Sequence, residues 1–153
     1  MRVAKDHSLG SSFQGVAASV AAAGFLSKVQ IYNPALSGLR VLIRRIHVTA
    51  DSTQISRLYP RDTTLASALT LGTNKRLGGA VATAQFWTQN IEAAAQSGQF
   101  AAKYVGTGSV FAFWDFGDLP IELAEGKGLV VHLDVVNVGL RAEFEWIERI
   151  GGA

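Results

Sequence analysis

Apolar and polar residues alternate with a period of two over much of the chain, which predicts β-strands. The first clear example is segment 25–33, with Phe25, Val29 and Ile31 on one face. The Asn33-Pro34 pair ends this strand, because proline lacks an amide hydrogen and restricts the residue before it. Further short strands are expected at 55–60, 80–89 and 99–106, whereas a short helix is favoured at 89–95 because Gly98 follows.

The segment 39–50 changes phase in its middle. Its apolar positions are Leu39, Val41 and Ile43 before the Arg44-Arg45 pair, and Ile46 and Val48 after it. One extra residue in a strand reverses the facing of everything that follows, so this slip predicts a β-bulge. A strand that is buried on both faces is the alternative.

The segment 109–116 carries large apolar side chains on both of its faces. Phe111 and Phe113 point one way, and Ala112, Trp114 and Phe116 point the other way. We therefore expect burial on both sides, with one face in the core and the other against a neighbouring subunit.

The clearest alternation comes near the C-terminus. One face carries Leu129, Val131, Leu133 and Val135, and after a turn at 137–139 the next strand carries Ala142, Phe144 and Trp146 against Arg141, Glu143 and Glu145. This pattern predicts a final β-hairpin. Roughly eight short strands in all predict an all-β fold, an antiparallel β-sandwich that is jelly-roll-like. Residues 25–153 are expected to form a single domain, preceded by an N-terminal arm or first strand over 1–24.

Composition adds a hint of association. Of the 153 residues, 48% are hydrophobic and 17% charged, against about a quarter charged in an average soluble domain. Some apolar surface is therefore expected to meet another chain. The 14 Lys and Arg residues are dispersed at a net charge of +2, so nucleic acid is not expected as a partner. Without a long apolar run, neither is a membrane.

Residues able to carry chemistry are few. The absence of cysteine excludes disulfides, thiol nucleophiles and thiolate metal sites. His132 and Asp134 share a strand face but lack a third ligand, and His47 with Asp51 lacks a nucleophile within reach of a base. Both histidines are interpreted as structural.

The glycine-rich segments and the acidic pairs have equally simple interpretations. Segments 106–109 and 125–128 are interpreted as hairpin turns, because no helix N-terminus follows them to bind a phosphate. Glu143 and Glu145 are expected on a solvated face. We therefore expect no catalytic, metal or cofactor-binding residues, no cofactor, and no enzymatic activity.

Trp87 is the most informative aromatic residue, because alternation places it on a polar face with Thr83, Gln85 and Gln89. It either contacts a partner or packs beneath a loop. The interface candidates are Trp87, Trp114, Phe116, Lys75 and Arg76.

Several turns and strands together carry a resemblance to a known group. They are Asn33-Pro34 followed by Gly38, the long strand 39–50, the Gly-x-Gly-Leu turn at 126–129, and a closing strand with Phe144, Trp146 and Glu148. Over residues 25–150 the chain resembles small β-sandwich virion proteins of tailed bacteriophages. The resemblance implies a capsid decoration or cement protein, assembled in the host cytoplasm and found in the virion. Such a protein is usually a homotrimer and binds the major capsid protein.

Two alternatives remain at this point. One is a tail-fibre or receptor-binding tip protein, in which Trp87 and the loop 73–79 contact a cell-surface glycan. The other is a free carbohydrate-binding module, in which Trp87 would again bind the sugar.

Overall fold

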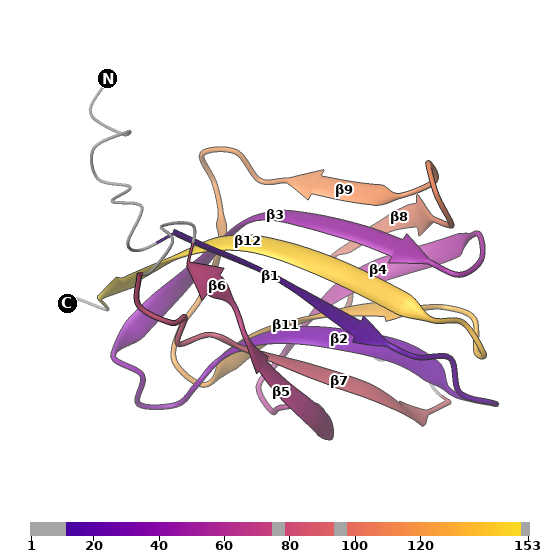
Figure 1. Ribbon diagram of the computed structural model, residues 1–153, viewed down its shortest axis with the longest axis horizontal. Coiled ribbons are helices and arrows are strands. Elements are labelled where there is room, and N and C mark those ends of the chain that lie inside the picture. The colour runs from indigo at the N-terminus through magenta and orange to yellow at the C-terminus, as the bar shows by residue number, and fades with distance from the viewer. Residues whose placement is uncertain (1–11, 75–78, 94–97, 151–153) are drawn as a thin grey trace.

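The computed structural model describes residues 12–74, 79–93 and 98–150, which form two six-stranded antiparallel sheets packed as a sandwich (Figure 1). Sheet A contains β1 (Ser12–Ser19), β3 (Leu39–Ala50), β6 (Thr73–Asn74), β9 (Ala112–Asp115), β10 (Ile121–Leu123) and β12 (Leu140–Ile150). Sheet B contains β2 (Leu26–Asn33), β4 (Gln54–Arg61), β5 (Ser67–Leu71), β7 (Gln85–Glu92), β8 (Ala101–Val105) and β11 (Lys127–Leu133). The expected antiparallel β-sandwich is confirmed.

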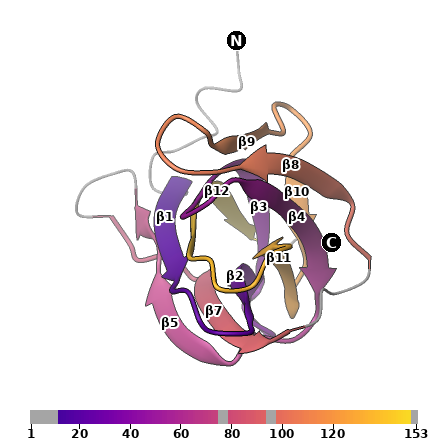
Figure 2. The same cartoon turned by 90° about the vertical axis from the view of Figure 1, so that its right-hand side faces the viewer.

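The strand order is that of a jelly roll. Across sheet A, β1, β12, β3 and β9 are neighbours, and across sheet B the order is β2, β11, β4 and β8. The chain crosses from one sheet to the other at each step from β1 to β4, and again from β8 to β9 and from β10 to β12. Such crossing produces the two Greek keys of a jelly roll. The additional strands β5, β6 and β7 extend both sheets on the side opposite β8 and β9 (Figure 2).

The core lies between the two sheets and is centred on aromatic residues. The ring of Trp146 stacks on Phe13 at 5.9 Å between centroids and meets the edge of Phe86 at 5.4 Å. Phe86 also stacks on Phe144, at 5.5 Å. These rings come from β1, β7 and β12, so the packing joins the two sheets directly.

The predicted bulge in segment 39–50 is confirmed. Glu145 on β12 lies opposite Arg45, but the next residue, Trp146, lies opposite Ile43, which leaves Arg44 as the extra residue. Val41, Ile43, Ile46 and Val48 are all fully buried on the inner side despite the change of phase. The bulge thus accounts for the phase slip, and the alternative of a strand buried on both faces is not required.

Both of the final strands form as predicted, but they do not pair with each other, so the predicted hairpin is wrong. β11 pairs with β2 and β4, whereas β12 pairs with β1 and β3. Both strands turn their apolar side chains toward the same core, so they face each other across the sandwich instead of lying side by side. The segments 106–109 and 125–128 were also wrongly predicted as hairpin turns, because each carries the chain between sheets.

The helix favoured at 89–95 is wrong for the residues that are described there. Residues 89–92 continue β7, which pairs with β2, and Gln89 accepts a hydrogen bond from the Ala66 N–H. Pairing with a strand far away in the chain thus overrides the local preference. The strand expected at 80–89 is shifted and begins at Gln85.

Of the two expectations for residues 1–24, the first strand applies to Ser12–Ser19. This strand, β1, pairs with β12 along its whole length and places Phe13 and Ala17 in the core. Residues 1–11 lie outside the described part of the chain.

Candidate functional site

The outer face of sheet B is covered over its central strands, whereas the edge strand β8 leaves Tyr104 exposed. On the central strands, Lys28, Gln30, Tyr59 and His132 are fully buried, although alternation places Lys28 and Gln30 on a polar face. The loop 62–66 is held over this face by side-chain hydrogen bonds. Gln30 Nε2 donates to Thr63 O at 3.0 Å, and Gln30 Oε1 accepts from the Leu65 N–H at 2.9 Å. We call this surface the covered face.

A buried polar cluster lies in the covered face and consists of Lys28, Tyr59, Gln89, Glu92 and His132. Lys28 is fully buried and forms an ion pair with Glu92, whose side chain is 39% exposed. The hydrogen bond from Lys28 lowers the pKa of Glu92, which keeps that carboxylate charged. Burial raises the pKa of Tyr59 and lowers the pKa of His132, so both are neutral near pH 7.

Four atoms in or beside this cluster are buried without a hydrogen-bond partner in the described part of the chain: Tyr59 Oη, Arg61 Nη1, Gln89 Nε2 and His132 Nε2. The Nδ1 atom of His132 lies 3.0 Å from Leu133 O, so Nδ1 carries the proton of the neutral ring and Nε2 is an acceptor. Buried polar atoms of this kind are normally satisfied by ordered water. The cluster's visible role is structural, since the amide of Gln89, together with that of Gln30 beside the cluster, holds the loop 62–66.

Trp87 also lies on the covered face. It is half-buried, packs against Tyr59, Leu65 and Val130, and donates from Nε1 to Gln85 Oε1 at 3.3 Å. This placement matches the alternative in which Trp87 packs beneath a loop. The candidates Lys75 and Arg76 lie outside the described residues.

The histidine and carboxylate pairs noted in the sequence are separated in space or otherwise engaged. His132 is buried, whereas Asp134 accepts a hydrogen bond from Arg57 Nε at 2.8 Å. Asp51 accepts from the backbone N–H of Gly139 at 3.1 Å, and the ring of its candidate partner His47 instead lies against Phe111 at a tilt of 41°. Within the described ranges, no group of three or more His, Cys, Asp or Glu side chains could hold a metal ion.

The outer face of sheet A is open, and we call it the open face. It contains the outward side chains of β1, β12, β3 and β9, which lie in rows across the sheet. One row is an ion-pair ladder in which Arg45 Nε lies 3.4 Å from Asp115 Oδ2 and Arg45 Nη1 lies 3.7 Å from Glu145 Oε2. Arg45 and Asp115 are about half exposed, at 50% and 45%, so water screens this ladder.

The next row of the open face is aromatic. Phe111 is 48% exposed and Phe113 is 42% exposed, and the ring of Phe111 lies 4.7 Å from that of His47. Trp114 points the other way and is only 6% exposed, with Phe116 packed against the core beside it. Segment 109–116 is therefore buried on one side within the chain. The side available to a partner carries Phe111 and Phe113 rather than the candidates Trp114 and Phe116.

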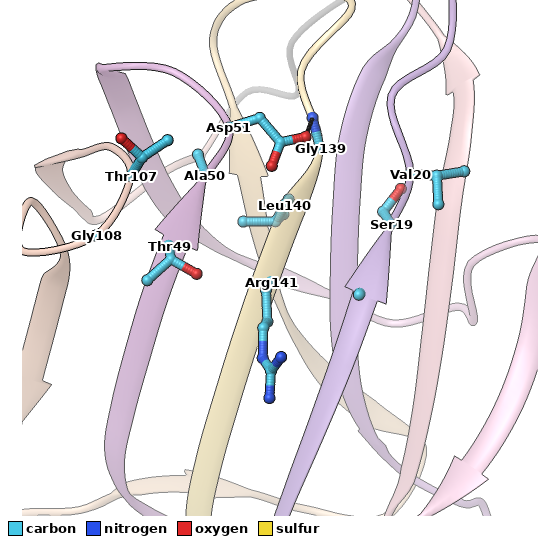
Figure 3. Close-up of a pocket in the computed structure, with 11 residues that line it drawn as sticks. Ser19, Val20, Thr49, Ala50, Asp51, Thr107, Gly108, Gly139, Leu140 and Arg141 are labelled. Atoms are coloured by element: carbon cyan, nitrogen blue, oxygen red, sulfur yellow. Dashed lines mark hydrogen bonds between the residues drawn. The ribbon is translucent and has the colours of Figure 1, made fainter.

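A pocket of about 530 Å³ lies at one end of the open face (Figure 3). Ser19, Thr49, Thr107 and Arg141 are among the residues that line it. The Asp51 carboxylate closes one side of the pocket and accepts a hydrogen bond from the Gly139 N–H. A side chain at position 139 would collide with this carboxylate, so the close approach requires glycine. The guanidinium of Arg141 makes no ion pair with the described residues, so this pocket combines hydroxyl groups with a free cation.

Comparison of the chain with protein-family models, with curated proteins and with solved structures found no match. In the part of the chain that the structure describes, there is no helix of the length and apolarity needed to cross a bilayer.

Sequence reasoning missed the surface residues that the structure brings together. Phe111 and Phe113 were assigned to one strand face, but alternation alone does not say which face points inward. The phase slip could have indicated further surface residues, because a bulge at Arg44-Arg45 turns both arginines toward the outer face.

Proposed function

We propose that the chain is a structural virion protein of a bacteriophage. In this proposal it is a decoration or cement protein that binds the outside of the capsid and stabilises contacts between subunits of the major capsid protein. Its jelly-roll sandwich is an architecture that viral capsid proteins use. The resemblance of its turns and closing strand to small phage virion proteins supports the same role.

The observation that carries the proposal is the difference between the two outer faces. The centre of sheet B is covered by a loop of its own chain, whereas sheet A exposes Phe111 and Phe113 beside charged rows and two pockets. Exposed aromatic side chains within a polar surround are typical of protein contact sites. The open face is thus the best candidate for the surface that meets the capsid or another copy of the chain in a homotrimer.

The test is the copy number of the chain relative to the major capsid protein in purified particles, measured by quantitative mass spectrometry. A ratio near parity is expected for a cement protein. A ratio of a few copies per particle would instead place the chain in the tail, and absence from particles would contradict a virion role.

A receptor-binding tip or carbohydrate-binding module remains the second candidate, favoured by one observation. The pocket at the end of the open face presents Thr49, Thr107 and Arg141 close to the segment that carries Phe111. Hydroxyl groups, a cation and a nearby aromatic ring can together bind a polar ligand. A glycan array probed with the wild type and with Arg141→Ala tests it, and the candidate requires a glycan signal that the variant loses.

A further inference from the structure

We propose that a second hollow on the open face, which we call the trough, binds an extended partner segment that carries an apolar side chain flanked by carboxylates. This inference deepens the proposed function and rests on it, because it describes the kind of segment that the capsid would offer. The trough encloses about 570 Å³ and lies at the opposite end of sheet A from the pocket in Figure 3.

The floor of the trough is apolar. Leu42 on β3 and Ile147 on β12 lie directly opposite each other, and both line the trough. The loop between β9 and β10 forms one wall with Leu119, which is 85% exposed, and Pro120. Ile147 is already buried, so an inserted apolar side chain would chiefly remove Leu119 from water, which favours binding.

The bulge in β3 supplies a cation to one rim. Arg45 is held by the ion-pair ladder with Asp115 and Glu145, while the extra residue Arg44 lines the trough. A regular strand would place only one of these two arginines on the outer face. Bulges commonly re-aim a side chain in this way beside a functional site.

A second cation lies on the opposite rim. Arg149 on β12 is the direct cross-strand neighbour of Arg40 on β3, and like charges in such positions repel. Arg40 is matched by Glu122 at 2.7 Å, but Arg149 forms no ion pair with the described residues. A carboxylate from a partner would relieve this repulsion.

The acidic residues near the trough do not cancel these cations. Glu122 is engaged by Arg40. The backbone N–H of Gly117, aided by Arg45 and Arg44, holds the pKa of Asp115 below its usual range. The Asp115 carboxylate is therefore already paired with the Gly117 N–H and with Arg45. Asp118 is then the one acid of the lining left to set against Arg44 and Arg149, which leaves the trough basic by one charge.

The wall of the trough is fixed before any partner arrives. Gly117 adopts φ 54°, in the left-handed region that favours glycine, and its N–H donates to Asp115 Oδ1 at 2.9 Å. The Phe116 N–H donates to Arg44 O at 2.9 Å, which ties the loop to the bulge. A preformed site avoids the cost of ordering a loop when the partner binds.

The first experiment measures binding of a fluorescent peptide, Glu-Glu-Leu-Glu-Glu, by anisotropy, with Gln-Gln-Leu-Gln-Gln as its neutral match. The wild type should bind the acidic peptide about tenfold more tightly than the neutral one, and added salt should weaken that binding. Arg149→Glu should lose about tenfold in affinity. Lys127→Glu is the control, since it also reverses the charge of an exposed cation but lines neither the trough nor the pocket, and the affinity should stay within about twofold.

Three results would overturn the inference: equal binding of both peptides by the wild type, equal losses in Arg149→Glu and Lys127→Glu, or dissociation of a wild-type oligomer by Arg149→Glu, which would make a second copy the occupant. Thermal unfolding checks that each variant is folded.

Particle occupancy separates this inference from the proposed function. If the peptide binds as expected but the chain is absent from particles, only the virion role fails; if Arg149→Glu occupies particles normally and no peptide binds, only the trough fails.

Discussion

The two outer faces of the sandwich differ in how deeply their charged side chains are buried and in how they are paired. On the covered face, the fully buried Lys28 forms an ion pair with one carboxylate, that of Glu92. On the open face, Arg45 is 50% exposed and shares its charge between Asp115 and Glu145. A buried charge must be paired, whereas an exposed charge remains hydrated and can exchange partners.

The polar residues of the two faces therefore have different roles. The amides of Gln30 and Gln89 hold a loop of the same chain, so the covered face contributes to stability. The open face leaves Arg44, Arg141 and Arg149 without ion pairs among the described residues and leaves Phe111 and Phe113 exposed. Such a surface is suited to contacts with another molecule.

The largest predicted effect separates the two sides of β9. Trp114→Ala should reduce the free energy of unfolding by about 3–4 kcal/mol, because it leaves a cavity in the core. Phe113→Ala, the neighbouring exposed position, should cost about 1 kcal/mol or less. Urea unfolding measures both. Similar losses would mean that the inner and outer sides of β9 are assigned wrongly.

The second prediction compares the same substitution on the two faces. Glu92→Ala removes the partner of the buried Lys28 and should cost about 2–3 kcal/mol, less than for a fully buried pair because water partly screens Glu92. Glu122→Ala breaks the exposed pair with Arg40 and should cost below about 1 kcal/mol. Urea unfolding of both variants provides the measurement. An equally small loss in Glu92→Ala would show that Lys28 is solvated in solution.

The third prediction tests what holds the loop 62–66. Gln30→Ala removes two hydrogen bonds and leaves the Leu65 N–H without its acceptor, which should cost about 2 kcal/mol. Amide hydrogen exchange at Leu65 should become faster in this variant. Gln14→Ala on the exposed surface of β1 is the control and should stay within about 0.5 kcal/mol. Unchanged exchange at Leu65 would contradict the role given to Gln30.

The smallest effect is a dependence on pH. Because burial lowers the pKa of His132 in the folded chain, the unfolded chain binds its proton more readily. Stability should therefore fall as the pH drops below about 6.5, the usual histidine value. This acid dependence should weaken in His132→Gln but persist in His47→Gln, as measured by thermal unfolding between neutral and acidic pH. An identical profile for the wild type and His132→Gln would contradict the assignment.

The facing of individual strands could be predicted from the sequence with good detail. The alternation around Val29 and Ile31 and along Ala142, Phe144 and Trp146 matches the burial in the structure, and the phase slip marked the bulge. The candidate site was predicted less well. Trp114 was considered a contact residue, but only the closed sandwich shows that this side of β9 is the inner one.

By itself, the sequence determined the strands, their two faces and the bulge, because the period of two is a local property of an extended backbone. The tertiary structure decided which strands share a sheet, why residues 89–92 are a strand, and which polar face is covered. It also brought Leu42, Arg44 and Arg149 together in one trough. These outcomes depend on contacts between residues far apart in the chain, and no local pattern records such contacts.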